Sequence, residues 1–147
     1  MIYYNYIIAS FIVRVFLGIL FFAQGFDKVF RLKVHSVIHA FEHPLEEHKM
    51  PAWIIKSAGV YTSYAELICG FLLLIGLMKS IALYLLGLDL LLVCTALSVI
   101  KPMWDTQFVL SRLALLITLL LLPPNWDVIS IDYLIGMIEF FNKMKLI

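Results

Sequence analysis

The sequence predicts an all-α membrane protein: a four-transmembrane-helix antiparallel bundle with a short amphipathic surface helix in the first loop and an interfacial C-terminal helix. Hydrophobic residues make up 63% of the 147 residues and the mean hydropathy is +1.00, whereas a soluble domain is about half apolar. Four apolar runs approach or reach the roughly 20 residues that cross a bilayer. Tyrosine, tryptophan and proline residues mark the ends of these runs, as expected at a membrane interface.

Length, charge and cysteine content narrow the class of protein. A chain of 147 residues allows one domain, which we expect to cover residues 1–147. The formal net charge of +1 provides no basic field for nucleic acid. Cys69 and Cys94 stand alone in apolar runs, so they predict neither a zinc site nor a disulfide framework. The N-terminal apolar run has no preceding Lys or Arg and no small-residue cleavage site, which favours a retained helix over a signal peptide.

The four predicted spans follow one another along the chain. They cover about residues 7–26, 57–78, 81–100 and 106–122. Three tyrosines precede the first span as an interfacial belt. Lys79 and Ser80 leave only a very short turn between the second and third spans, and Pro123 and Pro124 end the fourth.

Two segments outside the spans are expected to lie at the membrane surface. In the first loop, residues 29–56, apolar side chains recur at helical spacing, which predicts a short amphipathic helix: Val34, Val37, Ile38, Phe41 and Leu45. We expect Pro44 to interrupt that helix. The tail, residues 128–141, is too short to span a bilayer, so we expect an interfacial helix that closes against the tyrosine-rich N-terminus.

One face of the first span combines cations with small residues. At spacings of four, three, four and three, this stripe contains Arg14, Gly18, Phe21, Gly25 and Lys28. An arginine inside hydrocarbon costs about 2.5 kcal/mol or more, so the stripe must face protein or water. It also needs a carboxylate as a partner.

Each predicted span carries one ionisable residue near its middle. Counting about 1.5 Å per residue from each midpoint places four of them within roughly 5 Å of the membrane midplane: Arg14, Glu66, Asp89 and Arg112. We expect Arg14–Glu66 and Asp89–Arg112 contacts, or one shared network, because an unpaired charge is costly there. The network is interpreted in two ways: an architectural clamp that sets helix order, or a polar cavity for a ligand head group or a proton path.

Three histidines in the first loop raise the question of a metal site. His35, His39 and His43 recur every four residues, with Glu42 and Glu46 nearby. This spacing could present metal ligands on one helix face. A solvated polar face is the alternative, and we favour it because three imidazoles in a row need a second surface to complete a site. We therefore expect no metal.

Cations outside the spans indicate an orientation. Six are expected on the side of the first loop and three on the other: Lys28, Arg31, Lys33, Lys49, Lys56 and Lys101, against Lys79, Lys143 and Lys145. The positive-inside bias places the first loop in the cytoplasm and both termini outside.

With these residues in hand, the sequence resembles the DoxX family of small four-helix membrane proteins over about residues 10–120. Three patterns carry the resemblance: R-x3-G-x6-G-x2-K from Arg14 to Lys28, E-x3-G-x5-G from Glu66 to Gly76, and F-x2-P-L-x5-P-A from Phe41 to Ala52. The resemblance implies a subunit associated with quinol oxidation or thiosulfate–quinone oxidoreduction, and relatives that assist maturation of partner proteins. It also supports Arg14, Lys28 and Glu66 as the family's polar positions.

Three functions follow as hypotheses. The first is a redox-associated subunit in the bacterial inner membrane whose polar site accepts a quinone-like head group, with these ligand-binding candidates: Arg14, Gln24, Lys28 and Glu66. The second is an assembly or scaffold protein for a membrane partner, or a homo-oligomer, in which the charges are structural. The third is an ion translocator, which the absence of broken spans disfavours. No haem, flavin or thiol motif is visible, so we expect no stand-alone catalysis and no bound cofactor beyond a possible quinone.

Overall fold

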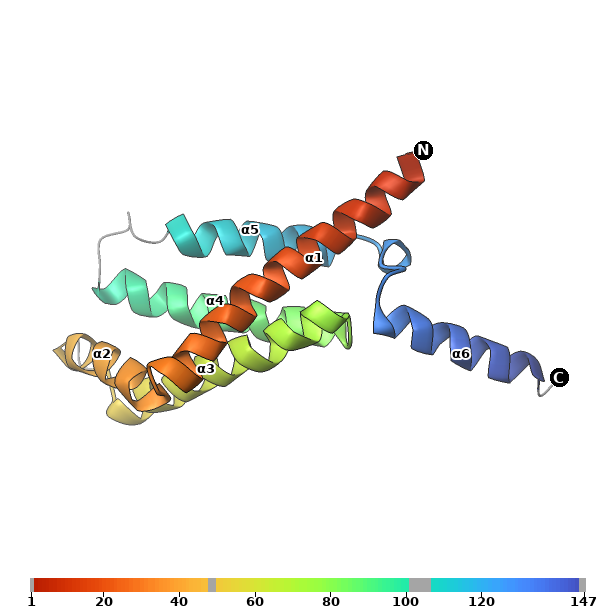
Figure 1. Ribbon diagram of the computed structural model, residues 1–147. Helices are drawn as coiled ribbons and strands as arrows, with labels where there is room; N and C mark the ends of the chain where they lie inside the picture. Colours follow the sequence, from red (N-terminus) through yellow and green to blue (C-terminus); the bar gives the residue numbers. More distant parts are fainter. Residues whose placement is uncertain (1, 48–49, 101–106, 146–147) are drawn as a thin grey trace.

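The computed structural model describes residues 2–47, 50–100 and 107–145 (Figure 1). Over these residues the chain forms helices and no strands, which confirms the predicted all-α class. Its elements are α1 (Ile2–Phe26), the π-helical turn η1 (Asp27–Arg31), α2 (Val34–Glu47), α3 (Ala52–Ile75), α4 (Lys79–Ile100), α5 (Gln107–Leu121), the 3-10 turn η3 (Pro124–Trp126) and α6 (Ile131–Lys145). The connection between the third and fourth predicted spans, residues 101–105, lies outside the described residues.

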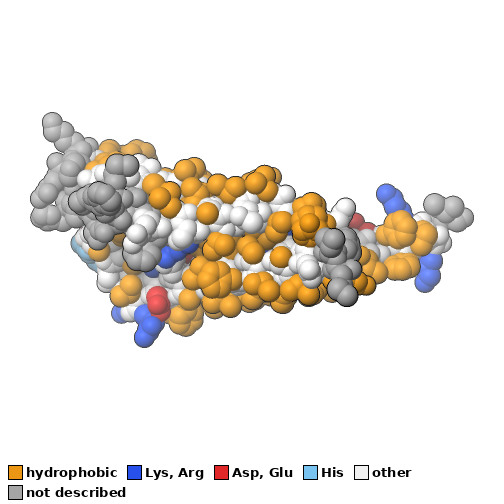
Figure 2. All heavy atoms as spheres, turned by 90° about the horizontal axis from the view of Figure 1, so that it is seen from above, with side chains coloured by type: hydrophobic (Ala, Val, Ile, Leu, Met, Phe, Trp, Pro, Cys, Tyr) orange, Lys and Arg blue, Asp and Glu red, His pale blue; other side chains and the backbone are white. Residues whose placement is uncertain are grey.

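Among the described residues, three helices are long and apolar enough to cross a membrane by length and composition, and one further apolar helix is shorter. The long ones are Tyr4–Arg31, Ala52–Ile75 and Lys79–Val99, and the shorter apolar helix is Val109–Leu121. Hydrophobic side chains cover most of the bundle face in Figure 2, and Lys and Arg side chains lie in its left part and on α6, beyond its right end. The bundle therefore presents a lipid-facing surface, as expected for a membrane protein.

The turn between α3 and α4 begins earlier in the chain than the sequence predicted. Helix α3 ends at Ile75 rather than near residue 78, because Gly76 adopts a left-handed conformation with φ of 71°. The amide of Gly76 donates to the carbonyls of Leu72 and Leu73, and the amide of Leu77 donates to Leu72. This is the glycine C-cap pattern that ends many helices, and it lets α4 begin at Lys79.

Helices α1 and α3 pack most closely, through glycines. A Cβ atom at Gly25 would lie 2.2 Å from the backbone nitrogen of Leu67, and one at Gly70 would lie 2.4 Å from that of Phe22. Gly18 faces Leu74 in the same way. The predicted stripe on α1 is therefore a helix-packing face, where small residues allow close backbone approach.

Helix α2 continues through Pro44, so the predicted interruption is wrong. Pro44 lies in the last turn of the helix, where its missing amide removes one hydrogen bond and few residues follow. The amphipathic pattern is confirmed, since Leu45 is buried and α2 packs against both α3 and α4. Helix α2 thus covers one end of the bundle beside the start of α3.

The C-terminal tail forms a helix, but this helix does not close against the N-terminus. Helix α6 projects from the end of the bundle where α3 meets α4 (Figure 1), and all of its described side chains are exposed. The contact with the tyrosine-rich N-terminus is made one segment earlier. There the ring of Trp126 stacks on that of Tyr6, with centroids 4.4 Å apart.

Candidate functional site

Two groups of polar and charged side chains stand out among the described residues, and all of their members except the exposed Asp132 are buried or half-buried. The Arg14 cluster lies at the α3–α4 turn and comprises Arg14, Lys79, Asp127, Ser130 and Asp132. The Glu66 cluster lies inside the bundle and comprises Gln24, Lys28, Glu66, Asp89 and Arg112. Each cluster contains two cationic and two anionic side chains, so neither carries a formal net charge.

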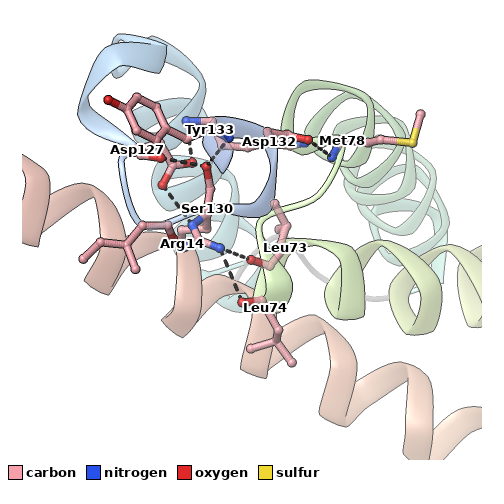
Figure 3. A network of polar contacts seen from close by, with 10 residues as sticks. Arg14, Leu73, Leu74, Met78, Asp127, Ser130, Asp132 and Tyr133 are labelled. Atoms are coloured by element: carbon pink, nitrogen blue, oxygen red, sulfur yellow. Dashed lines mark hydrogen bonds and ion pairs between the residues drawn. The ribbon is translucent and has the colours of Figure 1, made fainter. Parts of the chain in front are cut away.

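Arg14 is the centre of the first cluster (Figure 3). Its side chain is 1% exposed, and its Nε donates to Asp127 Oδ1 at 3.1 Å. Its other nitrogens donate to the carbonyls of Leu73 at 2.8 Å and Leu74 at 3.3 Å, and to that of Ile129. The last carbonyls of a helix have no partner within it, so the guanidinium also completes the C-terminus of α3.

The rest of the Arg14 cluster connects the tail to the start of α4. Lys79 Nζ lies 3.3 Å from Asp127 Oδ2. The carboxylate of Asp132 accepts from the backbone amides of Met78 at 2.8 Å and Lys79 at 3.0 Å. A carboxylate on these amides acts as an N-cap supplied from another element. Ser130 Oγ donates to the carbonyl of Asp127 at 2.7 Å, which fixes the turn before α6.

The predicted Arg14–Glu66 pair is wrong. Phe22 lies against Gly70, and Gly25 lies against Leu67. Because α1 and α3 run antiparallel in this register, Arg14 and the residues before it on α1 lie beyond the end of α3. Arg14 therefore lies beside Gly76, beyond the last turn of α3. Its partner Asp127, which follows the proline turn, was not among the predicted site residues.

Lys28 takes the place beside Glu66 that Arg14 was expected to take. Its Nζ lies 2.7 Å from Glu66 Oε2, and the two side chains are 22% and 3% exposed. Lys28 belongs to the π-helical turn that prolongs α1, and such turns occur often at functional sites. Arg112 donates to Gln24 Oε1 at 2.7 Å, so the predicted direct Asp89–Arg112 contact is also absent among the described residues.

Asp89 is the unusual member of the Glu66 cluster. Its side chain is 0% exposed, and neither carboxylate oxygen has a hydrogen-bond partner among the residues that the structure describes. Glu66, Lys28 and Arg112 all act on it electrostatically. Of the four charges that the depth count brought together, Arg14 lies in the other cluster, and Lys28 contacts Glu66 in its place. A buried carboxylate normally has hydrogen-bond donors, so Asp89 departs from the usual pattern.

A small cavity of about 120 Å³ lies beside this cluster, between α2, α3 and α4. Its walls are mostly apolar, with Ile38 and Phe41 from α2 and Val93 from α4, and Lys28 provides a charged side chain. Val93 is one helical turn after Asp89, so both lie on the same side of α4. The cavity is thus lined by apolar side chains and by one cation, Lys28, whose ammonium forms an ion pair with Glu66.

The histidines form a surface group on α2. The rings of His35 and His39 lie 4.3 Å apart, edge to face, and His39 Nδ1 lies 3.1 Å from Glu42. Lys56 also reaches Glu42. The side chain of His43 lies outside the described residues. Within the described part of the chain, no three His, Cys, Asp or Glu side chains are grouped to hold a metal.

The fold and the buried charges define a small helical protein of the membrane, with several membrane-crossing helices. A DoxX family profile matches residues 9–99, more than half of the chain. The protein belongs to the DoxX family. The matched residues contain Arg14, Lys28, Glu66 and Asp89, whereas Arg112 and Asp127 follow them. Searches of curated proteins and of solved structures find no match.

Proposed function

We propose that this protein is a redox-associated membrane subunit and that the Glu66 cluster binds a quinone-like head group. The observation that carries the proposal is Asp89, a fully buried carboxylate whose two oxygens have no donor among the described residues. It lies near the Lys28–Glu66 pair and an apolar cavity. Ligand sites in proteins commonly combine apolar walls with a few convergent polar groups.

The chemistry of a quinone head group suits these side chains. The flat ring needs an apolar compartment, and the cavity of about 120 Å³ is enough for one ring but not for a drug-sized molecule. A quinone carbonyl accepts a hydrogen bond, and the ammonium of Lys28, which forms an ion pair with Glu66, has three N–H donors. The hydroxyl groups of a quinol could donate to Asp89 or Glu66.

The structure changes which of the predicted ligand residues serve this proposal. Lys28, Glu66 and Gln24 remain in it, and Asp89 joins them. The guanidinium of Arg14 donates to Asp127 and to carbonyls at the end of α3. The proposal therefore does not include Arg14 among the quinone-binding residues. We place the protein in the bacterial inner membrane, with its redox partner supplying the electron-transfer centre.

Quinone binding is testable by thermal unfolding of the detergent-solubilised protein. A short-chain benzoquinone at about 100 times its dissociation constant should raise stability by roughly 2.7 kcal/mol. Glu66→Gln should abolish the shift, and Asp89→Asn, which keeps the side-chain shape, should weaken quinol binding more than quinone binding. Glu139→Gln makes the same change on exposed α6 and should leave the shift intact. No shift at saturating quinone would overturn the proposal.

The second candidate function is an assembly or scaffold protein for a membrane partner. The observation that favours it is the Arg14 cluster, in which Arg14 and Asp127 hold helix ends together. Under this proposal the charges are structural and the partner is a protein in the same bilayer.

Site-specific photo-crosslinking in native membranes separates the two functions. A crosslinker at Ile12, an exposed position on α1, should give one product with a single protein partner at equal stoichiometry if the protein is a scaffold. The same crosslinker at buried Leu17 is the control and should give none. If the crosslinker at Ile12 gave only lipid adducts and no protein product, that result would contradict the scaffold function.

A further inference from the structure

The cavity between α2, α3 and α4 has room for about one six-membered ring. Its volume is about 120 Å³. For comparison, an engineered cavity of about 150 Å³ with apolar walls binds benzene. A second ring fused to the first would therefore need space that packed side chains of the protein now fill.

The walls of this cavity differ in how much space their side chains take up. On the α3 side several of them are small, namely Ala58, Gly59 and Thr62. On the α2 side, Ile38 and Phe41 lie three residues apart on one helical face and are much larger. The phenyl group of Phe41 is the largest side chain among the described lining residues. Helix α2 therefore supplies the bulk that limits the size of the cavity.

Helix α2 is held beside the start of α3 (Figure 1) by contacts that a larger ligand would break. Ile38 lies directly over Gly59, where an added Cβ atom would be 2.7 Å from the Cγ1 atom of Ile38. Leu45 of α2 and Ile55 of α3 also line the cavity, and each is 4% exposed. Moving α2 outward would separate these side chains and expose apolar surface, which is unfavourable. The cavity thus has little capacity to widen around a bulkier ring.

The cavity offers one donor to a ligand. Lys28 lines it, and its ammonium lies 2.7 Å from Glu66. The other polar lining side chain is Thr62, whose hydroxyl donates to the carbonyl of Gly59 on its own helix at 3.3 Å. Among the described lining residues, Lys28 is therefore the side chain that can donate to a quinone carbonyl. The rest of the ring must then lie against the apolar walls, where its size decides whether it fits.

We propose that this site selects quinones with a single unfused ring, and that Phe41 is the side chain that excludes a second fused ring. The inference rests on the proposed quinone-binding function and adds the class of quinone to it. Phe41 acts by occupying space in the cavity. Phe41→Ala removes the whole phenyl ring, which contains more carbon atoms than a fused ring adds to a quinone. This variant therefore makes room for the larger ligand.

The test compares a dimethylbenzoquinone with the dimethylnaphthoquinone that differs from it only by the fused ring. Both dissociation constants are measured by calorimetric titration of the detergent-solubilised protein. The parent should bind the benzoquinone at least about tenfold more tightly. Phe41→Ala should bring the ratio of the two constants close to one, and the milder Phe41→Leu should give an intermediate ratio. Because ratios are compared between variants, unequal partitioning of the two quinones into detergent cancels.

Two further variants control for the position of the change. Phe16→Ala removes a phenyl ring from α1, where Phe16 is 51% exposed, and should keep the ratio of the parent. Ala96→Phe adds a phenyl ring to the α4 wall of the cavity and should weaken binding of both quinones at least about tenfold. Equal binding of the two quinones by the parent would overturn the inference and leave the proposed function standing, as would equal ratios for Phe41→Ala and Phe16→Ala. Binding of neither quinone by the parent would overturn both.

Discussion

Replacing Asp127 by Ala is expected to destabilise the protein by about 3–5 kcal/mol, the usual cost of removing one partner from a buried ion pair. Arg14 is 1% exposed and Asp127 is 6% exposed, so water cannot take the place of the carboxylate. Lys79 loses its ion contact at the same time, leaving two buried cations. The measurement is the free energy of unfolding in detergent, or the loss in thermal midpoint.

Two further variants make the Asp127 prediction specific. Asp127→Asn keeps an oxygen that can accept from Arg14 Nε, so its cost should be smaller than that of Asp127→Ala. Asp27→Ala removes the carboxylate from the pair with Arg31, whose side chains are 49% and 74% exposed. Such surface pairs contribute about 0–1 kcal/mol. Equal losses for Asp27→Ala and Asp127→Ala would contradict the clamp that we describe at the α3–α4 turn.

The same turn also explains what sequence reasoning could and could not predict. Helical spacing placed Arg14, Phe21 and Lys28 on one face of the first predicted span, and the structure buries Arg14 and Phe21 on the side of α3. Periodicity defines a face but contains no information about how far one helix slides along another. That axial offset depends on which glycines meet which backbone segments, here Gly25 against Leu67. The depth count assumed centred helices, so it paired Arg14 with the wrong carboxylate.

The partner of Arg14 was missed for a related reason. Asp127 follows the proline turn after α5, a region interpreted only as the end of a span. The sequence did contain a signal for this partner, because a cation that is buried at one end of the bundle needs an anion at the same end. Among the described residues, Asp127 contacts Arg14, and Asp132 accepts from the backbone amide of Lys79 at the start of α4. Sequence spacing alone does not connect residues that are 113 positions apart.

Gly25→Ala is expected to disrupt the α1–α3 interface. The new Cβ atom would lie 2.2 Å from the nitrogen and 2.5 Å from the Cα of Leu67. Those atoms belong to the backbone of α3, so no side-chain rotation relieves the clash and the two helices must separate. Overpacking of a core costs about 1–3 kcal/mol and sometimes more, and we expect the upper end of that range or beyond. The Lys28–Glu66 contact lies close to Gly25 along α1 and should weaken with it.

A series of alanine substitutions tests whether backbone proximity is the cause. The nearest α3 or α1 backbone atom would lie 3.0 Å from a Cβ at Gly18, 2.4 Å at Gly70 and 2.2 Å at Gly25, so the loss in thermal midpoint should increase in that order. Gly87→Ala is the control within a membrane-crossing helix, since its nearest neighbour is a side-chain carbon 3.9 Å away. Alanine also has the higher helix propensity, so Gly87→Ala should be neutral or stabilising. A loss at Gly87 as large as that at Gly25 would mean that the glycines matter for helix flexibility, and close helix contact would then not be what joins α1 to α3.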